Sequence, residues 1–129
     1  ACLSPWSDLE CAGESMKQNE ELDFLVQQET LLEWANIYLN GTDPRSPLAS
    51  TIHADLSGLE PVLIQTGGAE MLLSDAVQLE KKLKSAGNQV RLEVWEDMTH
   101  NWQMFAPILD KGQEAIDQVG SFIRNQIPD

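Results

Sequence analysis

The stretch Pro61-Val62-Leu63-Ile64-Gln65-Thr66-Gly67-Gly68 decides the fold class of this chain. A continuous apolar run that ends in a glycine pair is typical of a strand covered on both faces. A helix is predicted over residues 74–86, with Ser74 as its N-cap, and the alternation in residues 90–95 predicts a second strand. A strand, a helix and a strand in this order form a βαβ unit, which is parallel and right-handed.

Two more helices are predicted on either side of this unit. Residues 28–39 place apolar side chains at helical spacing, and Gly41 follows as a left-handed cap. The apolar stripe from Ile108 to Ile123 predicts a closing helix that ends near Gln126.

The amino-terminal segments are less regular. Residues 1–6 have the character of the end of an apolar strand, and residues 7–27 are polar and acidic, which predicts a long surface excursion. The fold class is therefore α/β with about three strands, whereas α/β sheets usually have about five or more. We expect residues 1–129 to be the carboxy-terminal part of a larger parallel sheet with flanking helices.

The composition excludes several classes of function. The 129 residues contain 8 Lys and Arg against 21 Asp and Glu, a net charge of −13, which disfavours nucleic acid and anionic membrane surfaces as partners. At 42% hydrophobic residues the chain can bury a core. No run approaches the roughly 18 apolar residues of a membrane span, and no signal-peptide pattern is seen, so a cytoplasmic location is expected.

The two cysteines, Cys2 and Cys11, do not have the spacing of a metal site or of a disulfide framework. Two reduced thiols are favoured, and a local bridge between them in an exported protein is the alternative.

The two histidines are the candidates for acid–base chemistry. His100 follows the strand at 90–95, and Glu70 follows the strand at 62–66. Loops after neighbouring parallel strands meet at one edge of the sheet, so Glu70 and His100 are predicted to face each other there. A carboxylate beside an imidazole orients the ring and stabilises its protonated form. His53, in a loop, is expected to be structural or exposed.

The residues alone leave alternatives to this pair. Glu70 and His100 could instead be a surface carboxylate in a turn and a loop histidine with a capping role. Asp75 is a competing acid, although its place in a first helical turn suits the helix dipole better than an imidazole.

Five segments together carry a resemblance to a known family. They resemble the carboxy-terminal part of the hormone-sensitive-lipase-like esterases, which have the α/β-hydrolase fold, in that family's order and over essentially the whole chain. In sequence order the segments are Leu3-Ser4-Pro5-Trp6-Ser7-Asp8-Leu9, Asp43-Pro44-Arg45-Ser46-Pro47-Leu48-Ala49-Ser50, Ala54-Asp55-Leu56-Ser57-Gly58-Leu59, Leu63-Ile64-Gln65-Thr66-Gly67-Gly68-Ala69-Glu70 and Glu93-Val94-Trp95-Glu96-Asp97-Met98-Thr99-His100.

The resemblance implies that Glu70 is the triad acid and His100 the triad base. Their separation of 30 residues suits the family, whereas Asp75 would lie 25 residues before the histidine. The chain departs from the family's pattern because no proline follows the acid. It also departs because neither Ser57 nor Ser121 has the glycines of the G-x-S-x-G nucleophile motif, and no H-G-G-G loop is present. In the family both motifs come before the position of Ala1.

The function implied by the resemblance is part of a serine carboxylesterase for short- to medium-chain acyl esters, with no metal or organic cofactor. The isolated chain is predicted to be inactive because it lacks the nucleophile and the oxyanion loop. Trp102, Met104 and Phe105 are expected either to line the acyl or alcohol pocket or to pack their loop onto the last helix.

Two other classes of function stay open. The chain could be a non-catalytic interaction module, or half of a split hydrolase whose open strand edge pairs with an amino-terminal half or another subunit. A small flavodoxin-like domain with an anion at Gly67 and Gly68 is disfavoured, because no basic residue follows and Glu70 would repel phosphate.

Overall fold

The strands form one parallel sheet in the computed structural model, which describes residues 1–127. The strands β1 (Cys2–Leu3), β2 (Val62–Gly67) and β3 (Val90–Trp95) lie in the order β1-β2-β3. Ile64 of β2 is in register with Cys2 on one side and with Leu92 on the other. The α/β class and the count of three parallel strands are therefore confirmed.

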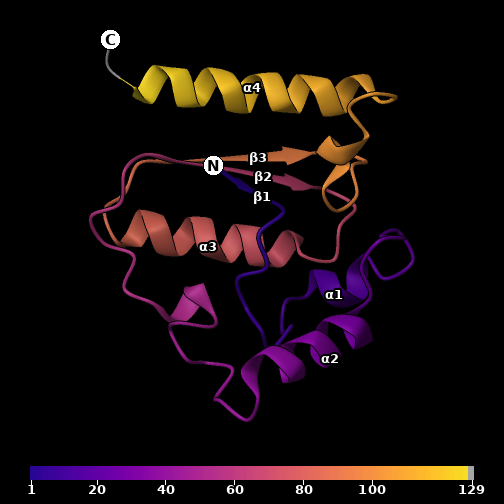
Figure 1. Cartoon of the computed structure of the whole chain (residues 1–129), viewed down its shortest axis with the longest axis vertical. Helices are drawn as coiled ribbons and strands as arrows, with labels where there is room; N and C mark the ends of the chain where they lie inside the picture. The colour runs from indigo at the N-terminus through magenta and orange to yellow at the C-terminus, as the bar shows by residue number, and fades with distance from the viewer. Residues whose placement is uncertain (128–129) are drawn as a thin grey trace.

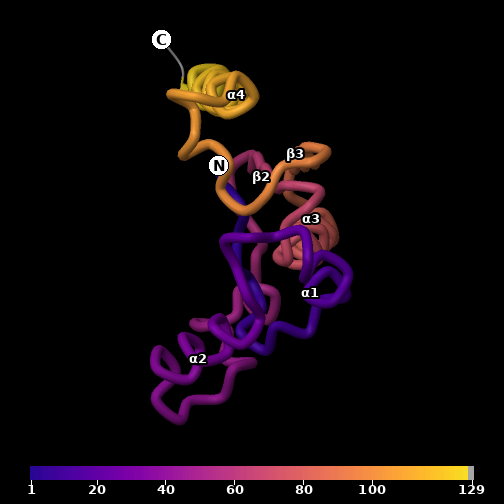
Figure 2. The backbone as a smooth tube through the Cα atoms, turned by 90° about the vertical axis from the view of Figure 1, so that its right-hand side faces the viewer, coloured from indigo at the N-terminus to yellow at the C-terminus, as the bar shows by residue number. Residues whose placement is uncertain are grey.

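The sheet is covered on both faces. Helix α3 (Leu73–Ser85) lies on one face and α4 (Asp110–Gln126) on the other, and Figure 2 shows these layers from the end. Ile64 packs against α3, and the Gln65 side chain donates a hydrogen bond to the Ala115 carbonyl of α4 at 3.0 Å. The unbroken apolar run of β2 therefore has the predicted cause, a strand buried between two helical layers (Figure 1).

The helix ends differ in part from the prediction. Helix α2 (Gln28–Leu39) has the expected bounds and ends through Asn40 and Gly41, both with positive φ. Helix α3 begins at Leu73 without a side-chain cap, so the predicted N-cap role of Ser74 is wrong. The Ser74 hydroxyl instead accepts a hydrogen bond from the Ser15 amide at 3.0 Å.

The predicted surface excursion at residues 7–27 is the largest error of the sequence analysis. This segment contains the short helix α1 (Ser15–Gln18), which lies beside α3 (Figure 1). Its side chains Cys11, Met16 and Val26 form a buried cluster with residues of α2 and of the turn before α3. Several polar side chains of the segment are buried, where they satisfy backbone groups, so their polarity does not indicate exposure.

The remaining short elements are the 3-10 helices η1 (Thr51–His53) and η2 (Trp102–Phe105). Within residues 1–127, no helix has the length and apolar character needed to cross a membrane. Cys2 and Cys11 are both free thiols, and burial raises the pKa of Cys11 to about 11.

Candidate active site

The turns after β2 and β3 meet at the carboxyl edge of the sheet. The Gly68 amide donates to the Trp95 carbonyl at 2.8 Å, and the Ala69 amide donates to the Met98 carbonyl at 3.0 Å. A Cβ atom at Gly67 would lie 2.0 Å from the Met98 carbonyl oxygen, so the two turns approach too closely for any side chain there. This contact brings the residues after each strand to one place.

Glu70, in the turn after β2, has a fully buried carboxylate. Its Oε2 accepts hydrogen bonds from the Ser4 hydroxyl at 2.7 Å and the Gly67 amide at 2.9 Å, and its Oε1 accepts one from the Thr66 hydroxyl at 2.8 Å. Burial raises the pKa of Glu70, against these hydrogen bonds, which lower it. Three donors aimed at one buried carboxylate hold its orientation.

His100, in the turn after β3, is half-buried. The Asn101 side-chain nitrogen lies 2.8 Å from Nε2; with this amide as donor, Nε2 is the acceptor and the neutral ring carries its proton on Nδ1. Nδ1 is buried and has no hydrogen-bond partner within residues 1–127. Burial lowers the pKa of His100, which favours the neutral ring, and the charge of Asp23 opposes this effect. This tautomer is the one that a general base requires.

Ser4 links the two residues. Its hydroxyl donates a hydrogen bond to Glu70 and accepts one from the backbone amide of Asn101 at 3.1 Å. One oxygen therefore joins the turn that carries Glu70 (the acid turn) to the turn that carries His100 (the base turn). Ser4 and Asn101 both have left-handed backbones, with φ of 43° and 51°. Such strained residues cluster at functional sites, where the surrounding structure holds them in place.

The Glu70–His100 pair itself stays a prediction. Both residues lie at the same edge, as expected, but no direct hydrogen bond joins the carboxylate to the imidazole among the described residues. Hydrogen bonding through Ser4 and the backbone of Asn101 takes the place of the direct contact in this structure.

Asp75, the competing acid, is held by a different part of the chain. It lies in the first turn of α3, fully buried, where Oδ2 accepts hydrogen bonds from the Ser7 amide at 2.8 Å and the Asp8 amide at 2.9 Å. Burial raises its pKa to about 6. Its partners are therefore the backbone of the segment after β1 and not the base turn.

Asp23 is a site residue that the sequence analysis missed. It is 1% exposed, its Oδ1 accepts from the Thr99 hydroxyl at 2.8 Å, and its Oδ2 accepts from the Met71 amide at 2.9 Å. Thr99 and Met71 are the immediate neighbours of His100 and Glu70. No local pattern marks this residue: of the apolar residues that follow it, Phe24 and Leu25 are exposed and only Val26 is buried.

The three predicted pocket residues have different surroundings. Trp102 is buried, with its ring centroid 5.6 Å from that of Trp95, and its loop packs onto α4 near Gly112. Trp102 and Phe105 also line an apolar hollow of about 360 Å³, whereas Met104 is 66% exposed and does not line it. The other residues that line this hollow are Phe24, Asp97, Met98, Thr99, Ile108 and Leu109.

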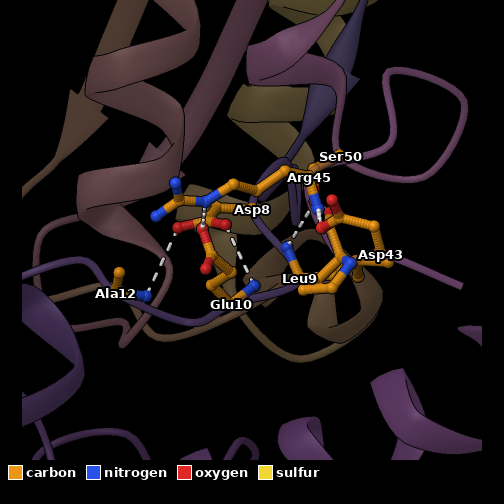
Figure 3. A network of polar contacts seen from close by, with 8 residues as sticks. Asp8, Leu9, Glu10, Ala12, Asp43, Arg45 and Ser50 are labelled. Atoms are coloured by element: carbon orange, nitrogen blue, oxygen red, sulfur yellow. Dashed lines mark hydrogen bonds and ion pairs between the residues drawn. The ribbon is translucent and has the colours of Figure 1, made fainter. Parts of the chain in front are cut away.

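A second group of polar side chains lies away from this edge. Asp8, Glu10 and exposed His53 bring potential metal-ligand atoms within 4.8 Å of one another. Figure 3 shows that the Asp8 carboxylate accepts hydrogen bonds from the Glu10 and Ala12 amides, while the Arg45 guanidinium pairs with Glu10 at 2.8 Å. Both carboxylates therefore already have partners within the fold, and we assign no metal to them.

Comparison with known proteins identifies the relatives of this chain. A family profile described as alpha/beta hydrolase fold matches residues 1–104. The chain is 45% identical over 123 residues to an acetyl-hydrolase from Streptomyces hygroscopicus, covering 95% of this chain and 41% of that protein. It is 31% identical over 121 residues to an esterase from Acinetobacter venetianus, covering 93% and 40%.

Solved structures give the same result. A crystal structure of an esterase from the bacterial hormone-sensitive lipase family superposes with a TM-score of 0.96 at 50% identity, covering 98% of this chain and 43% of that one. A crystal structure of EstE5 has a TM-score of 0.95 at 43% identity, covering 96% and 42%. The chain spans about two fifths of the length of the curated relatives it matches.

These matches confirm the resemblance to the hormone-sensitive-lipase-like esterases and exclude the flavodoxin-like alternative. The chain belongs to the alpha/beta hydrolase fold family, in the part of it that contains acetyl-hydrolases and esterases.

Proposed function

We propose that this chain supplies the acid and the base of a serine carboxylesterase for short- to medium-chain acyl esters. In this proposal residues 1–129 are the carboxy-terminal part of one α/β-hydrolase domain, Glu70 is the triad acid and His100 the base. The observation that carries it is that the Ser4 hydroxyl bonds both the buried Glu70 carboxylate and the backbone amide of Asn101, the residue directly after the imidazole of His100. The esterase and acetyl-hydrolase relatives supply the reaction class.

In the proposed reaction, His100 Nε2 accepts the proton of a serine hydroxyl while the serine oxygen attacks the ester carbonyl carbon. Protonated His100 then donates this proton to the leaving alcohol oxygen, and an acyl-enzyme remains. Water attacks the acyl group in the second half, with His100 again taking and returning a proton. Glu70 orients the ring through Nδ1–H and stabilises its charged form. No metal or organic cofactor takes part.

Two details of the histidine support these roles. The side-chain amide nitrogen of Asn101 lies 2.8 Å from Nε2. It occupies the donor position that the reaction gives to a serine hydroxyl. Among the described residues Nδ1 is a buried donor without a partner, and leaving such a group unpaired costs about 1–3 kcal/mol. In the proposed active arrangement Nδ1–H donates to the Glu70 carboxylate, which would satisfy this buried group.

The proposal assigns the nucleophile and the oxyanion donors to an amino-terminal part of the hydrolase or to another subunit, because this chain contains neither motif. Within residues 1–127, β1 pairs with β2 on one side only, which leaves an edge for a further strand. Trp102 and Phe105 would contribute to the substrate pocket through the apolar hollow, and Met104 would join them from its exposed position. Two free thiols agree with a cytoplasmic location.

A hybrid enzyme tests this proposal. Residues 1–129 are joined to the part of the Streptomyces hygroscopicus acetyl-hydrolase that precedes its region of similarity, and hydrolysis of p-nitrophenyl acetate and butyrate is measured. We expect turnover by the hybrid and none by the 129-residue chain alone. In the hybrid, His100→Ala should lower kcat by on the order of 10⁴-fold or more.

The exposed His53 provides the matched control, because His53→Ala removes the other imidazole of the chain. Its kcat should equal that of the unsubstituted hybrid. A hybrid whose turnover survives His100→Ala would overturn the proposal. Turnover by the 129-residue chain alone that is lost in His100→Ala would contradict the assignment of the nucleophile to another part.

A further inference from the structure

We propose that Asp23 is a positioning residue of this site, one carboxylate that ties the turn carrying Glu70 to the turn carrying His100. The inference rests on the proposed function, because it gives Asp23 a role only through those two residues. Asp23 touches neither the substrate nor the reacting atoms in this proposal.

The hydrogen bonds of Asp23 connect three segments that are far apart in the sequence. One oxygen accepts from the Thr99 hydroxyl, and the other accepts from the Met71 amide. The oxygen that binds Thr99 also accepts from the amides of Leu25 and Val26 at 3.1 and 3.2 Å, which fixes the carboxylate on its own loop. Both turns are therefore held against one rigid group.

A neighbouring side chain holds the acid turn from the same segment. The Asn19 amide donates to the Glu70 carbonyl at 2.8 Å and to the Gly68 carbonyl at 3.1 Å. Among the described residues, the Asn19 side chain donates hydrogen bonds to the acid turn alone, whereas the Asp23 side chain bonds both turns. Asp23 thus adds a buried side-chain link between the two turns to the backbone hydrogen bonds of Gly68 and Ala69 and to the contacts of Ser4.

Asp23 affects His100 through its negative charge as well as through the hydrogen bond to Thr99. Burial lowers the pKa of His100, and the negative charge of Asp23 raises it again, so this carboxylate favours the imidazolium that forms during turnover. The same charge raises the pKa of Glu70. Removal of the charge therefore lowers the pKa of His100, which measures the electrostatic contact between Asp23 and the base.

The first measurement is the pKa of His100 by NMR in the 129-residue chain. Only His53 and His100 contribute imidazole signals, and a His53→Gln variant assigns them. Asp23→Asn keeps the size of the side chain and removes its charge, so the pKa of His100 should fall. Asp75→Asn is the matched control, since it removes another buried carboxylate that binds two backbone amides, and it should leave this pKa unchanged.

The second measurement is kcat in the hybrid enzyme. Asp23→Asn should lower kcat by on the order of 10- to 100-fold, the effect expected when a catalytic group is slightly misplaced. Thr99→Val cuts the tie to the base turn and leaves the charge in place, so it should lower kcat as well. Thr99→Ser keeps the hydroxyl and should restore kcat. If Asp23→Asn fails to fold, the Thr99 pair decides the question.

The inference and the proposed function fail in different ways. An unchanged His100 pKa and an unchanged kcat in Asp23→Asn, together with dependence of the hybrid on His100, would overturn the inference alone. Equal kcat values for Thr99→Val and Thr99→Ser would also overturn it. Turnover that is independent of His100 would overturn the proposed function, while the NMR comparison would still test the contact between Asp23 and the histidine.

Discussion

The βαβ unit of residues 61–95 and the segment of residues 7–27 meet at the same site but are built in different ways. The βαβ unit satisfies its backbone through regular hydrogen bonds of β2, α3 and β3. The segment at 7–27 has only one short helix and uses side chains for the same purpose. Its amide donors and their side-chain acceptors are Ser7 and Asp8 to Asp75, Leu9 to Ser50, Glu10 and Ala12 to Asp8, Ser15 to Ser74, and Leu25 and Val26 to Asp23.

This difference shows how the two regions divide the work of the site. Regular strands and their turns carry Glu70 and His100 to the same edge of the sheet. The irregular segment supplies buried polar groups, Asp23 and Asn19, that hold these turns in place. An irregular backbone can be buried only when each buried amide has a hydrogen-bond partner. In this segment polar side chains supply such partners.

The same difference explains how far the sequence could predict the molecule. The run around Ile64 and the alternation to Trp95 are local patterns, and they predicted the strands, the helix between them and the edge that holds Glu70 and His100. The contacts of Ser4 with Glu70 and of Asp23 with Thr99 join residues 66 and 76 positions apart. A sequence pattern does not predict such contacts, because an aspartate that will be buried cannot be distinguished by residue type from one that will be exposed.

The largest effect is expected where the end of β2 contacts the turn after β3. Gly67→Ala would place a Cβ atom 2.0 Å from the Met98 carbonyl oxygen, and neither backbone can yield without separating the two turns. We expect destabilisation by about 4 kcal/mol, which is exceptional for one substitution. Urea unfolding measures it. Gly68→Ala is the control, since its Cβ would meet atoms no closer than 3.4 Å; equal losses in the two variants would contradict the packing described.

A smaller effect, dependent on pH, is expected where the two regions join at Asp75. The pKa of this carboxyl rises from 3.8 to about 6 on folding because it is buried, so the folded chain binds the proton more tightly. The protonated form stabilises the fold below about pH 4, and this contribution is lost as the pH rises through 6. Its size is about 3 kcal/mol.

Urea unfolding between pH 4 and 7 measures this contribution as the difference between the wild type and Asp75→Asn. The variant should gain stability relative to the wild type as the pH rises through this range. Ser85→Ala, an uncharged change on the same helix, should follow the wild type at every pH. A constant difference between the wild type and Asp75→Asn would show that the burial of Asp75 has no such consequence.

The central claim is that Glu70 of the acid turn, and not Asp75, orients His100 in an ester hydrolase. It is tested most directly by kcat for p-nitrophenyl butyrate in the hybrid enzyme carrying Glu70→Gln or Asp75→Asn, with circular dichroism to confirm folding. We predict a loss on the order of 10⁴-fold for Glu70→Gln, as for other triad acids, and turnover near that of the unsubstituted hybrid for Asp75→Asn. Full turnover by folded Glu70→Gln, with loss in Asp75→Asn, would contradict it.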